Sequence, residues 1–187
     1  MFSFSPAQAY AFYGFLEDIF VEKLRSMLDS RIRKALQAEF KNQFHIDDAE
    51  YDVFTTIFKH KLARSEVNTI IAYMSGVHPD SIHTAEQLTK PGPARCLALL
   101  YRGENTIQVI REKLGSTDPS KAAVGTIRSD YGRDIMKNGA HASDSIESMT
   151  RERRIIGFTQ NYPSMTKKTI EYWLSLREKM EWEKLGI

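Results

Sequence analysis

The first 76 residues carry apolar side chains at the spacing of an α-helix, with charged residues between them. Over residues 6–40 the apolar positions return every three or four residues, which predicts one long helix or two helices separated near Asp29. Two further helical patterns follow, one after Asp48 and one after Ser65, and Gly76 ends the second of them. We therefore expect the N-terminal part of the chain to be helical.

From residue 77 onward the pattern changes to short elements separated by glycine and proline. Residues 77–92 hold two prolines and show no period, so we expect a surface loop there. Ala94–Tyr101 is short and almost wholly apolar between a proline and a glycine, which predicts a strand covered on both faces. Met1–Phe4 resembles the end of another strand. Helices are expected over 103–114, 126–134, 144–156 and 166–182.

Composition narrows the class of protein. The 187 residues are enough for one domain with a sizeable core. The 26 Lys and Arg nearly balance the 24 Asp and Glu, so we predict no nucleic-acid partner. A single cysteine, Cys96, excludes an internal disulfide framework and fits a reducing compartment. Because no apolar run approaches the roughly 18 to 20 residues that span a bilayer, we predict a cytoplasmic protein with no membrane partner.

One histidine, His141, lies between a turn and the start of a predicted helix. Asn138 and the glycine after it form a strong turn signal. Ser143, Asp144 and Ser145 follow, and any of them can accept the free N–H groups of a helix's first turn. Glu147, three residues after Asp144, would complete a capping box. A helix N-terminus offers free backbone N–H groups and the positive end of a dipole, and both suit an anion such as phosphate.

Other polar residues could serve that histidine. Arginine forks and a threonine hydroxyl suit phosphate oxygens, and a carboxylate suits the distal imidazole nitrogen, whose tautomer it fixes. Candidates of these types near His141 are Arg111, Thr117, Arg128 and Glu152. The other four histidines lack the spacing of a zinc site, so we predict no metal site built by the protein. A purely structural interpretation stays open, in which His141 is a capping residue of a helical scaffold.

The segment Gly103–Glu152 resembles the nucleoside diphosphate kinase family. It reads GENTIQVIREKLGSTDPSKAAVGTIRSDYGRDIMKNGAHASDSIESMTRE. The family pattern is G-E-N, then R-x-x-x-G-x-T-[ND]-P, then G-T-[IL]-R, then N-x-x-H-[GA]-S-D-S, with a glutamate eleven residues beyond the histidine. The match is ungapped over fifty residues. Ala142 replaces the more frequent glycine and Val124 a common proline, and both are small changes.

The resemblance implies a role for each matching residue. His141 would be the nucleophile that accepts a γ-phosphate, and Glu152 and Ser143 would orient its ring. The nucleotide-binding residues would be Arg111, Thr117, Arg128 and Asn138, joined by Tyr13 on a weaker resemblance of the start FSFSPAQAYAFY to the family's second strand and following helix. The implied reaction is ping-pong transfer between nucleoside triphosphates, such as ATP, and diphosphates. Mg²⁺ would arrive with the nucleotide, and a homo-oligomer is implied.

The implied fold class is α+β, a ferredoxin-like antiparallel sheet with covering helices. The family's first strand carries Lys-Pro-Asp, which this chain does not show, because Lys90 and its proline are followed by Gly92. We therefore expect a single domain over 1–187 that lacks this strand. Within it, residues 17–92 would be a helical or loop insertion, residues 94–158 the catalytic portion and residues 159–187 a C-terminal helix.

An open sheet of this kind would need another copy, an upstream polypeptide or a local strand to fill the gap. The abrupt start favours an incomplete or split gene product. Two functional hypotheses follow, a nucleoside diphosphate kinase and a catalytically impaired member that acts as a nucleotide-binding or oligomer-forming interaction module.

Overall fold

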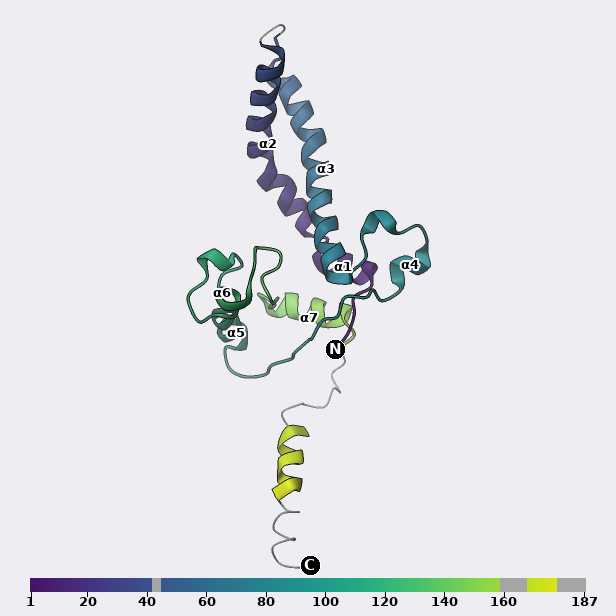
Figure 1. Cartoon of the computed structure of the whole chain (residues 1–187), viewed down its shortest axis with the longest axis vertical. Coiled ribbons are helices and arrows are strands. Elements are labelled where there is room, and N and C mark those ends of the chain that lie inside the picture. Colours follow the sequence, from purple (N-terminus) through teal and green to yellow (C-terminus); the bar gives the residue numbers. More distant parts are fainter. Residues whose placement is uncertain (42–44, 159–167, 178–187) are drawn as a thin grey trace, which may run out of the picture. The chain divides into compact units, whose positions relative to one another are not determined.

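The computed structural model describes residues 1–41, 45–158 and 168–177, and they divide into two compact units, Met1–Ile156 and Gly157–Ile187. In the second unit residues 168–177 are helical, which confirms the expected last helix over that range. Its predicted ends at 166 and 182 lie outside the described residues. The helices of the first unit (Figure 1) are α1 Pro6–Tyr13, α2 Leu16–Phe40, α3 Asp48–Ser75, α4 Ala85–Thr89, α5 Thr106–Leu114, α6 Ile127–Tyr131 and α7 Ile146–Ile155.

Two long helices, α2 and α3, pack side by side as a hairpin (Figure 1). Of the alternatives for residues 6–40, two helices are observed, but they are separated at Gly14 and Phe15 and not near Asp29, where α2 is continuous. The two helices expected after Asp48 are one. Asp47 and Glu50 form a reciprocal capping box at the start of α3. Every fourth residue of α3 is buried, which gives the helix one inward stripe: Tyr51, Thr55, Lys59, Ala63, Val67, Ile71 and Ser75.

The hydrophobic core lies where α1 meets the C-terminal half of α3 and α7. Ser5 and Gln8 cap α1 reciprocally, and Pro6 occupies its first turn. The Gln8 side-chain amide also donates to the carbonyl of Ile155 at 3.0 Å, which links α1 to α7. The buried core residues are Phe4, Ala9, Phe12, Val67 and Ile71.

The predicted antiparallel sheet is wrong for the described part of the chain, which is helical and contains no strand. An isolated antiparallel bridge stands in its place, in which Phe2 and Cys96 exchange backbone hydrogen bonds of 3.0 and 2.8 Å. The residues after Cys96 in the predicted strand Ala94–Tyr101 form no ladder, because no second described segment lies alongside them. A strand needs paired neighbours, and its own apolar sequence does not supply them.

Residues 77–92, expected to be a plain loop, contain the 3₁₀ turn Pro79–Ser81 and the helix α4. The end of this segment is fixed to the core, since the Gly92 N–H donates to the Phe4 carbonyl at 2.9 Å. A Cβ on Gly92 would come within 1.9 Å of the Ser75 carbonyl oxygen, so only glycine allows this approach. Among all described helices, none combines the length and the apolar character that a membrane span requires.

Candidate functional site

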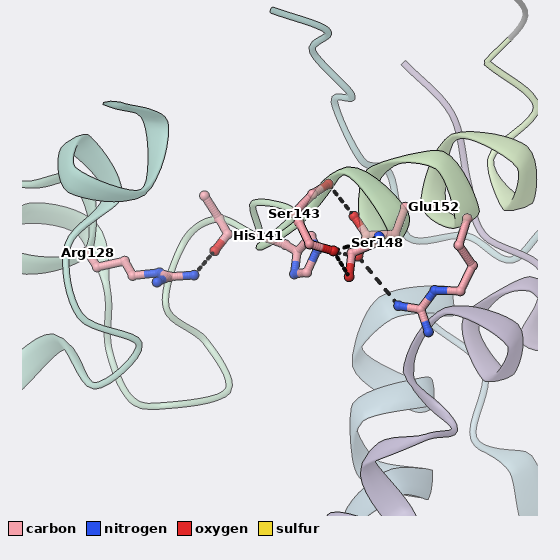
Figure 2. Close-up of polar contacts among 8 residues, drawn as sticks. Arg128, His141, Ser143, Ser148 and Glu152 are labelled. Atoms are coloured by element: carbon pink, nitrogen blue, oxygen red, sulfur yellow. Dashed lines mark hydrogen bonds and ion pairs between the residues drawn. The ribbon is translucent and has the colours of Figure 1, made fainter. Parts of the chain in front are cut away.

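An arginine holds together the loops on one side of the site. Helix α5 ends at Gly115, whose φ of 81° belongs to the left-handed region, and Thr126 caps α6 next to it. Arg128, on α6, donates from Nη1 to the Gly115 carbonyl and from Nη2 to the Ala140 carbonyl, both at 2.9 Å. Figure 2 shows the guanidinium group and one of these bonds. The guanidinium group of Arg128 therefore cross-links the end of α5 to the residue that precedes His141.

A carboxylate on α7 holds His141 from the other side. Glu152 Oε1 lies 3.0 Å from His141 Nε2, and the Ser143 hydroxyl donates to Glu152 Oε2 at 2.6 Å (Figure 2). The Glu152 residue is 7% exposed, whereas the His141 side chain is 41% exposed. An ionised carboxylate can only accept a hydrogen bond, so the neutral form of His141 carries its N–H on Nε2, facing Glu152, and has its lone pair on Nδ1.

The N-cap of α7 is Ser145, one of the three residues that the sequence offered for this position. Its hydroxyl accepts from the Ser148 N–H at 3.0 Å. The capping box expected between Asp144 and Glu147 is not formed, and Asp144 instead has its pKa lowered, first by a hydrogen bond with Ser148. Glu152 lies in the second half of the helix, from where its side chain reaches the loop that carries the histidine.

The hydrogen bonds keep Glu152 ionised despite its burial. Burial acts in the direction that raises the pKa of this carboxyl group, but the hydrogen bonds with His141 and Ser143 outweigh it, so the pKa is lowered. Arg151 contributes less, with Nη2 3.6 Å from Glu152 Oε1. An ionised, doubly hydrogen-bonded carboxylate fixes both the tautomer and the orientation of the imidazole.

Two aromatic rings from α1 pack edge-on against the imidazole. The centroid of Phe12 lies 5.1 Å from that of His141, and the centroid of Tyr13 lies 5.9 Å from it. Burial, followed by the charge of Glu152, raises the pKa of the Tyr13 phenol well above its usual range. The structure thus places Tyr13, which the weaker resemblance gave as a nucleotide-binding residue, against the histidine. It adds Phe12, which the sequence marked only as one of many apolar helical positions.

Arg111 and Arg128 are close enough for their charges to interact. Burial, followed by the charge of Arg111, lowers the pKa of Arg128. Arg111 forms no ion pair with any described residue, although its charge is among the smaller causes that lower the pKa of Asp144. Two neighbouring guanidinium groups favour an anion near them.

Thr117 and Asn138 brace two loops against each other. The Asn138 side-chain amide donates to the Ile135 carbonyl at 2.9 Å and to the Thr117 carbonyl at 3.3 Å. Gly139, at φ 88°, makes the predicted turn. In this structure the Asn138 amide therefore holds the backbone of the segment before His141.

Sequence reasoning also missed Arg151. Besides its approach to Glu152, its guanidinium carbon lies 4.8 Å from the ring centroid of Phe15, a cation–π contact that restrains the side chain. The available signal was its position next to the glutamate in the sequence. In the described ranges, no three His, Cys, Asp or Glu side chains gather as a metal site would require.

This arrangement defines a class of site. A histidine with one nitrogen held by a buried carboxylate and the other left basic, beside two arginines, is suited to nucleophilic attack on a phosphorus atom. A family model described as nucleoside diphosphate kinase matches residues 81–161. The match includes the histidine, the glutamate and both arginines.

Individual relatives agree. The nucleoside diphosphate kinase of Staphylococcus epidermidis is 44% identical over 81 residues, which are 43% of this chain and 54% of the relative. That of Archaeoglobus fulgidus is 37% identical over 103 residues, 49% of this chain and 66% of the relative. That of Wigglesworthia glossinidia brevipalpis is 53% identical over 53 residues, 28% of this chain and 37% of the relative.

These matches support membership of the nucleoside diphosphate kinase family for residues 81–161. It spans about half the length of the curated relatives from Staphylococcus epidermidis and Methanoregula boonei. The helices α2 and α3 precede the matched segment.

Proposed function

We propose that this protein transfers the γ-phosphate of a nucleoside triphosphate to a nucleoside diphosphate through a phosphohistidine on His141. The observation that carries the proposal is the 3.0 Å contact between Glu152 Oε1 and His141 Nε2. This contact supports a proton on Nε2 and, with it, Nδ1 as the nucleophile. The Ser143 hydroxyl bond at 2.6 Å holds the carboxylate in place for this task.

The chemistry balances in two half-reactions. In the first, the Nδ1 lone pair forms a bond to the γ-phosphorus, and the bond from that phosphorus to the β–γ bridging oxygen breaks. The diphosphate leaves with the electron pair, and Glu152 compensates the positive charge that develops on the ring. In the second, a terminal oxygen of another diphosphate attacks the phosphohistidine, and Nδ1 recovers its lone pair.

The surrounding residues would bind the nucleotide. Arg111 and Arg128 would contact its phosphate oxygens, Thr117 and Asn138 its phosphates or sugar, and Tyr13 would restrain the imidazole from the opposite side. Mg²⁺ would enter as part of the nucleotide substrate, where it spreads the phosphate charge. A homo-oligomer and a cytoplasmic location remain predictions.

A second candidate function is nucleotide binding without transfer. Both terminal nitrogens of Arg128 already donate to backbone carbonyls. To bind the phosphate that is transferred, this side chain would have to break one of these hydrogen bonds or donate to the phosphate in addition. The chain would then act as an interaction module of the same family.

The test is labelling with γ-labelled ATP and Mg²⁺. The expected product is protein-bound phosphate that is acid-labile and base-stable and that passes to added GDP. It should disappear in His141→Ala and persist in His60→Ala, a control at an exposed histidine on α3. Labelling that GDP cannot remove would show that only the first half-reaction takes place. Absence of labelling from the native protein, with nucleotide binding retained, would overturn the phosphohistidine proposal and favour the second candidate.

A further inference from the structure

The segment that follows the β-bridge is built as a strand with an open edge. Residues 94–99 alternate between half-buried and exposed, with Ala94, Cys96 and Ala98 on the inner side. This period of two is the pattern of an extended strand. Cys96 packs against the core formed by α1 and α3, which fixes the inner face of the segment.

The outer positions are apolar and exposed. Four large side chains are at least half exposed in this run: Leu97 (68%), Leu99 (60%), Leu100 (50%) and Tyr101 (58%). The backbone of Leu97–Arg102 forms no hydrogen bond with any described residue. An apolar strand with unpaired N–H and C=O groups is a template for another strand.

The bridge fixes the side toward which each backbone group points. Cys96 exchanges both of its backbone hydrogen bonds with Phe2, so its N–H and C=O point toward Phe2. Successive residues of a strand point these groups to opposite sides. In a continuing strand the groups of Leu97, Leu99 and Tyr101 therefore point away from Phe2, toward the open edge, while those of Ala98 and Leu100 point to the Phe2 side.

Charge selects the occupant of this edge. The run is uncharged, but Arg95 and Arg102 bracket it, and both are exposed. Neither forms an ion pair with a described residue. Residues 95–102 contain no carboxylate, so pairing with the same run of a second copy would bring four cations together without an anion among them.

We propose that the edge Leu97–Tyr101 binds an extended segment of a different polypeptide, apolar at its centre and acidic at both ends. The added segment pairs with this run on the side away from Phe2, so the bridge between Phe2 and Cys96 is kept. Its backbone satisfies the open N–H and C=O groups, and its carboxylates face Arg95 and Arg102. This interaction is independent of the phosphotransfer proposed for His141.

The test is amide hydrogen exchange of the full chain with a synthetic peptide of alternating valine and threonine that carries glutamates at both ends. The peptide should protect the amides of Leu97, Leu99 and Tyr101 and leave those of Ala98 and Leu100 unchanged. A matched peptide with lysines in place of the glutamates should bind about three- to tenfold more weakly.

Variants separate the backbone contribution from the charge contribution. Leu99→Pro removes an open-edge N–H and should abolish the protection, whereas Leu99→Val keeps it. The double variant R95E/R102E should reverse the preference and select the lysine peptide. Equal binding of both peptides, or protection at Ala98 and Leu100 instead, would overturn the proposal. Protection of these amides without any peptide would also overturn the proposal, because the edge would already be occupied. If that protection grew with protein concentration, the occupant would be a second copy of the chain.

Discussion

In the α2–α3 hairpin, helices of 25 and 28 residues pack along their length, whereas the longest helix of the segment Thr106–Ile155 has 10 residues. The hairpin is held by regular apolar burial on one stripe. The site segment is held by side chains that bond to the backbone at turns, as Arg128 does at Gly115 and Ala140. Apolar packing tolerates small displacements of side chains, whereas a hydrogen bond weakens steeply when its distance or angle changes. Atom positions are therefore more tightly restrained in the site segment than in the hairpin.

The two regions meet in one core. Val67 and Ile71 of α3 pack with Phe12 of α1, and the Phe12 ring contacts His141. The lower half of the hairpin therefore supports the site, while its distal half exposes apolar side chains such as Phe54 and Ile57. Substitutions can test whether the lower half of the hairpin also contributes more to the free energy of unfolding than the distal half does.

The largest effect is expected for Ile71→Ala, at a fully buried position. Removing a buried Ile side chain to Ala costs about 2–5 kcal/mol of the free energy of unfolding. Ile57→Ala is the matched control, because Ile57 lies on the same helix with 49% exposure, and its cost should stay below about 1 kcal/mol. Urea denaturation followed by circular dichroism measures both. Similar losses for the two variants would show that the hairpin is stabilised evenly along its length.

This comparison also explains what the sequence could predict. The helical period located the helices of the N-terminal part and placed α5, α6 and α7 to within a few residues, because local spacing decides which face is buried. It could not decide whether α2 breaks at Asp29, since no strong helix-breaking residue stands there and packing against α3 carries the helix through. The sheet was predicted from an apolar run and a family resemblance, and strand pairing depends on a partner segment elsewhere.

The site shows the same division. The motif located His141, Ser143 and Glu152 in the sequence, and the structure brings them within hydrogen-bonding distance. The motif did not reveal that Phe12 packs on the ring, because an apolar residue in a helical stripe has no distinguishing signal. It also left open that the Arg128 guanidinium bonds backbone carbonyls, since its partners are set by the turn at Gly115.

An intermediate effect is expected for Gly115→Ala. Both Gly115 and Gly125 have positive φ values, 81° and 83°, so alanine pays a backbone cost of about 1–2 kcal/mol at either position. At Gly115 a Cβ would also lie 2.4 Å from the Thr126 hydroxyl oxygen, whereas at Gly125 nothing lies within 4 Å. Gly125→Ala is therefore the control for the backbone term alone.

Amide exchange of the α5 and α6 helices measures the difference between these two variants. Gly115→Ala should raise exchange in both helices beyond the effect of Gly125→Ala, and leave the amides of α3 unchanged. Equal exchange in the two variants would mean that the contact with Thr126 does not hold this turn. Increased exchange in α3 would mean that the hairpin and the site segment unfold together.

The smallest effect is the pH dependence contributed by Glu152, a single carboxylate in the site segment. Its pKa in the folded protein lies below the ordinary value of 4.5, so its hydrogen bonds stabilise the fold fully above that pH. This contribution is lost as the pH falls through the lowered pKa. The difference in free energy of unfolding between native protein and Glu152→Gln should therefore be constant above about pH 5 and shrink in more acidic solution.

Glu147→Gln is the control on the same helix, at an exposed position that does not contact His141. A difference for Glu152→Gln that grows as the pH falls would show that burial outweighs the bonds to His141 and Ser143, and that the carboxyl group is neutral in the folded site.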